Sequence, residues 1–71
     1  MLHLESELLL FRALYPPLKR VWIKSNAGHR LSKGRVIRVS IQEGRVVITV
    51  RRDGKKTSWA YPTSRIEVSN A

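Results

Sequence analysis

The stretch Arg35–Tyr61 decides the fold. It reads RVIRVSIQ over 35–42, EG over 43–44, RVVITVRR over 45–52, DG over 53–54 and KKTSWAY over 55–61. The longer runs are rich in β-branched and aromatic residues, and each Xaa-Gly pair can supply the positive φ angles that a tight hairpin turn requires. The stretch therefore predicts three antiparallel strands joined by two two-residue turns.

The first turn gives a register that sorts side chains by polarity. With Glu43–Gly44 as the two turn residues, Ile41 lies opposite Val46 and Ile37 lies opposite Val50. A slip of one residue would mix apolar and charged side chains on both faces.

The second turn extends the same two faces. With Asp53–Gly54 as a two-residue loop, Ile48 lies opposite Trp59 and Val46 lies opposite Tyr61. The predicted inner face is apolar and contains Ile37, Val39, Ile41, Val46, Ile48, Val50, Trp59 and Tyr61. The predicted outer face carries the cations Arg38, Arg45, Arg51 and Lys56, with Val36, Val47, Thr49, Ser58 and Ala60 among them.

Length and charge limit the possible functions. The 71 residues suffice for one small domain, and a chain of this size buries only about 60% of its unfolded surface. There is no cysteine, which excludes disulfides, thiolate zinc sites and a cysteine nucleophile. The 14 Lys and Arg against 5 Asp and Glu favour an anionic partner, nucleic acid first and a membrane surface second.

The N-terminal segment Leu2–Tyr15 predicts one amphipathic helix, which Pro16–Pro17 ends. Apolar residues at helical spacing are Leu4, Leu8, Phe11 and Tyr15, with Leu10 and Leu14 beside them. The helix either packs across an open side of the sheet or also forms a homo-oligomer interface through Leu4, Leu8 and Phe11. The contiguous apolar run Leu8–Phe11 is too short for a membrane span or a signal peptide, so we expect a cytoplasmic location.

The segment between the helix and the central stretch predicts a strand and a long basic loop. Leu18–Lys24 alternates as a first strand, with Trp22 on the face opposite Val21 and Ile23. Trp22 could stack on a base, or it could cover the end of the sheet or meet the helix. The loop spans residues 25–34, where Arg30 and Lys33 could reach a phosphate backbone.

The end of the chain predicts a short 3₁₀ turn near Pro62–Arg65, a last strand at Ile66–Val68 and a frayed tail over residues 69–71. The domain division is thus residues 1–17 for the helix and its proline stop, and residues 18–68 for the β structure.

This order of elements resembles the SH3-like small barrels. Members include KOW domains, Tudor domains, the C-terminal domain of retroviral integrases and the plasmid-borne type II dihydrofolate reductases. The segment Lys33–Val39 looks KOW-like, and Tyr61–Ile66 looks like the strand–3₁₀–strand ending of these barrels. The resemblance covers residues 18–68 and implies a five-stranded SH3-like barrel, but the same barrel serves many tasks.

Two functions found among these barrels do not fit the residues. The pore run Gln-Ile-Tyr-Pro of the type II reductases corresponds here to Trp59-Ala60-Tyr61-Pro62, which lacks the amide that would bind pterin and nicotinamide. A methyl-lysine cage would need several exposed aromatic residues, and Trp59 and Tyr61 are predicted to point inward.

The remaining residues do not suggest catalysis. The two histidines, His3 and His29, are far apart and give no zinc-ligand spacing, and the acids form no plausible acid–base pair. We therefore expect a protein that is not an enzyme and binds no metal or cofactor.

The leading hypothesis is a small basic nucleic-acid-binding protein. Its predicted contacts with phosphates are Arg30, Lys33, Arg38, Arg45, Arg51, Arg52, Lys55 and Lys56. Duplex DNA is slightly favoured over RNA, because few exposed aromatic residues are predicted. The alternative is a protein-interaction module, such as a small phage or plasmid accessory protein or inhibitor, whose basic face docks an acidic partner.

Overall fold

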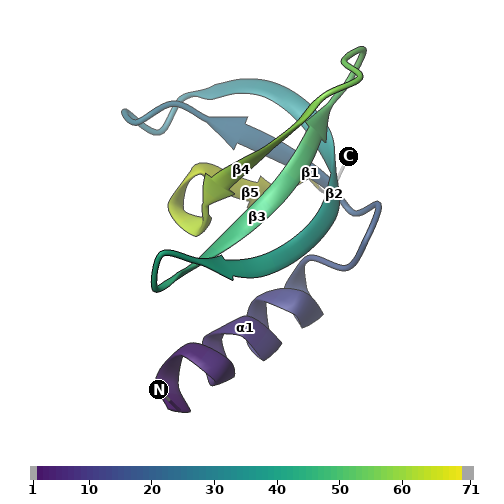
Figure 1. The fold of residues 1–71 in the computed structure, drawn as a ribbon. Coiled ribbons are helices and arrows are strands. Elements are labelled where there is room, and N and C mark those ends of the chain that lie inside the picture. The colour runs from purple at the N-terminus through teal and green to yellow at the C-terminus, as the bar shows by residue number, and fades with distance from the viewer. Residues whose placement is uncertain (1, 70–71) are drawn as a thin grey trace.

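The computed structural model describes residues 2–69 and places one helix before an antiparallel sheet (Figure 1). Helix α1 spans Leu2–Leu14. The strands are β1 (Arg20–Lys24), β2 (Arg30–Gln42), β3 (Arg45–Arg52), β4 (Ser58–Pro62) and β5 (Ile66–Val68), and the 3₁₀ turn η1 (Thr63–Arg65) joins the last two. A mainly β chain preceded by one helix, as the sequence predicts, is confirmed.

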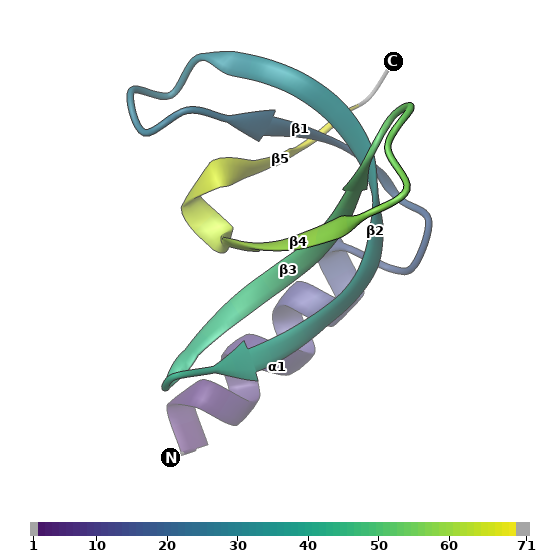
Figure 2. The same cartoon turned by 45° about the horizontal axis from the view of Figure 1, so that its top comes forward.

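The strands form one five-stranded, curved sheet in the order β4-β3-β2-β1-β5 (Figure 2). The long strand β2 bends across the sheet, because it pairs with β1 through its first half and with β3 through most of its length. Strands β4 and β5 are the two edges, and within residues 2–69 no ladder joins them. The predicted closure into a barrel is therefore absent: β5 has only three residues and pairs with β1 alone, while η1 carries the chain from one edge to the other.

The hairpin of β2 and β3 turns where the sequence predicts. Glu43 and Gly44 have φ angles of 52° and 74°, which is the pattern of a type I′ turn, so the twist of the turn matches the twist of the strands. Gln42 pairs with Arg45 and Ile41 with Val46, as expected. Ile41 lies too near the turn to be covered, and it is exposed rather than buried.

A β-bulge at Ile37 changes the predicted register of β2. The pairing shifts between Val36 and Arg38, so that Val36 rather than Ile37 lies opposite Val50. The prediction that Val36 lies on the outer face is wrong: it is fully buried, whereas Ile37 is only half-buried. A bulge adds local twist, and a strand of 13 residues that serves two partners needs such a bend.

The connection between β3 and β4 is longer than the sequence predicts. Lys55 N donates to Arg52 O at 3.0 Å and Gly54 has a φ of 79°. Asp53 is not among the described residues with positive φ, so this is not the I′ turn that closes a two-residue hairpin. Residues 53–57 all leave the ladder, and the register of β4 moves by two residues. A shift of two keeps each side chain on its face, so Trp59 moves from Ile48 to Val50 and Tyr61 takes the place opposite Ile48.

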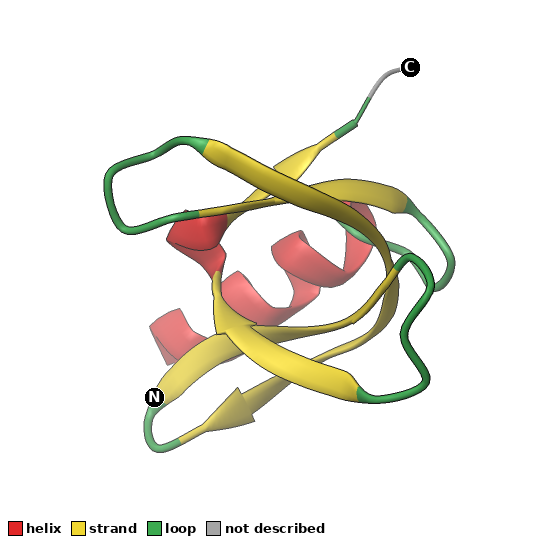
Figure 3. Ribbon diagram, turned by 90° about the horizontal axis from the view of Figure 1, so that it is seen from above, coloured by secondary structure: helices red, strands yellow, loops and turns green. Residues whose placement is uncertain are grey.

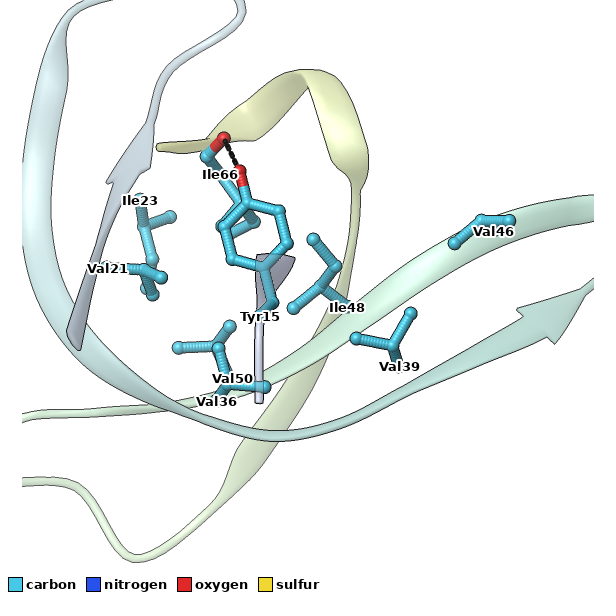
Figure 4. Close-up of a cluster of buried hydrophobic side chains, with 9 residues drawn as sticks. All are labelled: Tyr15, Val21, Ile23, Val36, Val39, Val46, Ile48, Val50 and Ile66. Carbon is cyan, nitrogen blue, oxygen red and sulfur yellow. Dashed lines mark hydrogen bonds between the residues drawn. The ribbon is translucent and has the colours of Figure 1, made fainter. Parts of the chain in front are cut away.

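The core lies on the inner face of the curved sheet and beneath the helix. Its buried members, shown in Figure 4, are Tyr15, Val21, Ile23, Val36, Val39, Val46, Ile48, Val50 and Ile66. Tyr15 follows directly after α1, and its hydroxyl donates to Ile66 O at 3.4 Å. The end of the helix is thereby joined to the first residue of β5.

Helix α1 lies across one open end of the curved sheet (Figure 3). Leu4, Leu8 and Phe11 are partly buried against the core, so the residues proposed for an oligomer interface are used within the chain itself. Among residues 4–14, the exposed leucines of α1 are instead Leu9, Leu10 and Leu14. On the predicted outer face, Arg38, Arg45 and Arg51 are exposed, but Val47 and Thr49 are buried, so this face is not open along its whole length.

Several predicted boundaries change. The first strand begins at Arg20 rather than Leu18, because Lys19 N donates to Pro16 O and Leu18 adopts a φ of 69° in that turn. The loop predicted over residues 25–34 is only Ser25–His29, since Arg30 already belongs to β2. Ser69 is buried and its amide donates to Arg20 O, so it is not frayed; residues 70 and 71 lie outside the described chain.

Candidate nucleic-acid interface

Three arginines lie side by side on neighbouring strands. Arg20 of β1 pairs with Arg35 of β2, and Arg35 pairs with Arg51 of β3. We call these residues the arginine row. Like charges placed directly opposite one another destabilise a sheet, and favourable cross-strand pairs contribute only about 0.2–1 kcal/mol each. The row therefore lowers stability unless anions lie beside it.

A cavity of ≈ 210 Å³ opens where the arginine row meets the β3–β4 loop. It is lined by Arg35, Arg51, Arg52, Asp53, Gly54 and Lys55, which supply four positive charges against one carboxylate. Within residues 2–69, the side chains of Arg35, Arg51 and Arg52 form no hydrogen bond or ion pair with the protein. Their donors are thus available to an anion that has several acceptor oxygens.

Asp53 fixes the loop beside the row. Its carboxylate accepts two hydrogen bonds from Arg20, at 2.9 Å and 2.8 Å, and its backbone amide donates to Lys33 O at 3.0 Å. The ion pair is solvent-exposed and adds little stability. Its effect is positional, because it ties the loop that carries Lys55 to strands β1 and β2. It also compensates the charge of Arg20 and leaves Arg35 and Arg51 without a carboxylate.

A second ion pair engages Arg30, one of the predicted contacts, and Lys33 lies beside it over the Trp22 ring. Arg30 Nε donates to Glu67 Oε2 at 2.9 Å and the same guanidinium donates to Oε1 at 3.2 Å. This hydrogen bonding lowers the pKa of Glu67 and raises the pKa of Arg30. Arg30 and Lys33 also lie over the Trp22 ring, 5.2 Å and 4.7 Å from its centroid. A base would have to displace these cations to stack on Trp22.

The structure divides the other predicted cations into two groups. Arg51, Arg52 and Lys55 converge on the cavity, and Lys56 follows in the same exposed loop. Arg38 and Arg45 are exposed farther along the hairpin, opposite Thr49 and Gln42. They extend the basic outer face but do not line the cavity.

Arg20 and Arg35 are the two arginines of this interface that the sequence does not predict; Asp53 and Gly54, predicted only as turn residues, also line the cavity. Strict alternation from Ile37 assigns Arg35 to the inner face, and only the bulge at Ile37 returns it to the outer face beside Arg51. A signal was present at Gly34, because glycine inside a strand often marks a bulge or a close approach of backbones. In this part of β2, a bulge lies at Ile37 and the backbone of Gly34 closely approaches that of Arg51.

Other kinds of site have little support in the described residues. No helix between residues 2 and 69 is long and apolar enough to cross a membrane. In the same part of the chain, no group of three His, Cys, Asp or Glu side chains could hold a metal ion.

Comparison of the chain with protein-family models, curated proteins and solved structures finds no match.

Proposed function

We propose that this protein binds the sugar-phosphate backbone of nucleic acid through the arginine row and the adjoining cavity. The observation that carries the proposal is the pairing of Arg35 with Arg51 on adjacent strands, with no protein acceptor for either guanidinium within residues 2–69. Phosphates supply closely spaced anionic oxygens, which match neighbouring arginines. A net charge of +9 strengthens the long-range attraction to a polyanion. The role is one of binding, without catalysis, metal or cofactor.

The SH3-like architecture belongs to the same proposal. The 3₁₀ turn between the last two strands and the tight hairpin between β2 and β3 support the resemblance to that group. In the described chain, β4 and β5 each pair with a strand on one side only, as expected for a sheet that stays open at its edges.

The test removes the charges of the central pair. We expect Arg35→Gln/Arg51→Gln to weaken binding of a labelled oligonucleotide by about 10- to 100-fold, because two charge-assisted hydrogen-bonding groups are lost. The slope of log K against log salt for duplex DNA should become shallower by about 2. Fluorescence anisotropy with duplex DNA, single-stranded DNA and RNA at several salt concentrations measures both quantities.

The matched control is Arg45→Gln/Lys24→Gln, which removes the same charge away from the cavity. If this variant weakens binding as much as the row variant, the attraction is general and the site is not localised. If the wild-type protein binds none of the three ligands near physiological salt, nucleic acid is not its partner.

The exposed face of α1 favours a second candidate, which is a protein-interaction module. Leu9, Leu10 and Leu14 are 67%, 56% and 48% exposed, which is costly for leucines on one short helix. If α1 mediates self-association, Leu9→Gln/Leu10→Gln should convert an oligomer into a monomer in sedimentation equilibrium. Leu18→Gln, which alters an exposed leucine outside the helix, should not. If the wild-type protein is a monomer, α1 does not mediate self-association. An acidic protein that stays bound after nuclease treatment would support docking of a protein partner on the basic face.

A further inference from the structure

Trp59 is the large aromatic side chain that the structure leaves open to solvent. It is 61% exposed, although its register places it on the inner face of the sheet opposite Val50. The two-residue shift of β4 explains the exposure, since Tyr61 occupies the place over Ile48 that Trp59 would otherwise take. Trp59 is thereby moved toward the β3–β4 loop on an edge strand, where no described strand covers it.

Cations lie close to Trp59 in the sheet and along the chain. Arg52 is two residues beyond Val50 on β3, so it is the diagonal neighbour of Trp59 on the same face, at a separation of about 7–8 Å between backbones. Arg52 and Lys55 line the basic cavity, and Lys56 leads from it toward β4. The exposed indole therefore lies on the inner face next to Arg52, which lines the cavity, whereas Arg35 and Arg51 lie on the outer face of the same sheet.

The two tryptophans differ in what already lies near them. Trp22 is half-buried and has Arg30 and Lys33 over its ring. No cation lies over the Trp59 ring within the described chain. The sequence assigned the stacking role to Trp22 and a place on the apolar inner face to Trp59; the register confirms that face, but the Trp59 side chain is exposed rather than buried.

We infer that Trp59 stacks on an unpaired nucleobase while Arg52 and Lys55 hold the flanking phosphates. This inference rests on the proposed function and narrows its ligand to a single-stranded nucleic acid. Bases in a duplex already stack on one another, whereas an unpaired base offers a π face to an aromatic side chain. The occupant is a nucleotide rather than an apolar protein segment, because the cations beside Trp59 complement phosphate. The reason for favouring duplex DNA, a lack of exposed aromatic residues, no longer applies.

The experiment compares a labelled oligothymidylate of about 12 nucleotides with its duplex on oligoadenylate. We expect Trp59→Ala to weaken binding of the single strand by about 5- to 100-fold and to change binding of the duplex by less than about twofold. Trp59→Phe should recover part of the loss because the ring is retained. In a Trp22→Phe background, the single strand should quench the remaining fluorescence of Trp59.

The outcomes separate this inference from the proposed function. If Arg35→Gln/Arg51→Gln weakens both ligands while Trp59→Ala weakens neither, the backbone site stands and the stacking role is overturned. The stacking role is also overturned if Trp59→Ala lowers the affinity for single strand and duplex equally, or if the single strand binds without quenching the Trp59 fluorescence. If neither ligand binds the wild-type protein, the proposed function itself fails. Thermal unfolding of each variant shows that the exposed substitution leaves the fold intact.

Discussion

Tyr15→Ala is expected to lower the free energy of unfolding by about 3–5 kcal/mol, the range for removing a large aromatic side chain from a core. Tyr15 is only 9% exposed and packs among the buried residues of the sheet (Figure 4). Its ring also stacks with Phe11, with centroids 6.2 Å apart. Domains have roughly 0.05–0.15 kcal/mol of stability per residue, so this loss is a large part of the total for a chain of this size. Urea denaturation followed by circular dichroism measures it.

Two controls separate the ring from its hydroxyl and from the helix surface. Tyr15→Phe keeps the ring and loses one long hydrogen bond to Ile66 O, so it should cost only about 0.5–1.5 kcal/mol. Leu14→Ala, at an exposed position, should change stability by less than about 0.5 kcal/mol. If Tyr15→Ala costs as little as Leu14→Ala, α1 is not docked on the sheet in solution.

Tyr15 also gives the fold a sensitivity to alkaline pH. Burial, and secondarily the carboxylate of Glu67, raises the pKa of the Tyr15 phenol above its ordinary value of 10.0. Because the folded state holds this proton more tightly than the unfolded state, the stabilisation is complete below about pH 10 and is lost as pH rises through the folded pKa. Above about pH 10, the wild-type protein should therefore lose stability relative to the Tyr15→Phe variant.

The sequence predicts local features of this fold well. Proline placement and leucine spacing give the helix, and Glu43–Gly44 gives a hairpin, because these effects act within a few residues. Asp53–Gly54 shows the limit of such local reasoning. Its dipeptide suits a tight hairpin, but the Asp53 carboxylate pairs with Arg20, 33 positions away, and the turn takes another form. Sequence pattern alone does not reveal that distant partner.

The candidate site depends on one inserted residue. Period-two alternation is reliable only while a ladder is regular, and the bulge at Ile37 reverses the predicted faces of Arg35 and Val36. Arg51 could be assigned from the alternation of faces along its strand, and Arg52 and Lys55 from their position at the second turn. Arg35 could not, although the structure places it at the centre of the arginine row. The exposure of Trp59 could not be predicted either. It follows from the length of the β3–β4 loop, whereas the alternation of side chains along β4 predicts only which face Trp59 occupies.

Gly34→Ala should destabilise the fold by about 1–3 kcal/mol and weaken nucleic-acid binding as well. A Cβ at Gly34 would lie 2.6 Å from the backbone oxygen of Arg51 and 2.7 Å from Val50 Cγ1. A backbone oxygen cannot move aside as a flexible side chain can, so β2 and β3 must separate at this point. The expected sign is the opposite of the usual one, since alanine ordinarily stabilises a strand interior relative to glycine by roughly 0.5–1 kcal/mol. Urea denaturation measures the stability change.

The effect on binding follows from the position of Gly34 immediately before Arg35, across from Arg52. Separating the strands there moves Arg35 away from Arg51 and widens the cavity, so affinity for an oligonucleotide should fall at temperatures where the variant is still folded. Gly28→Ala is the matched control: its Cβ would meet nothing within 4 Å, but its φ of 86° is strained for alanine. It should lose about 1–2 kcal/mol of stability and keep wild-type affinity. If Gly34→Ala binds as tightly as Gly28→Ala, the spacing of Arg35 and Arg51 does not determine recognition, and the cavity is not where the phosphate is held.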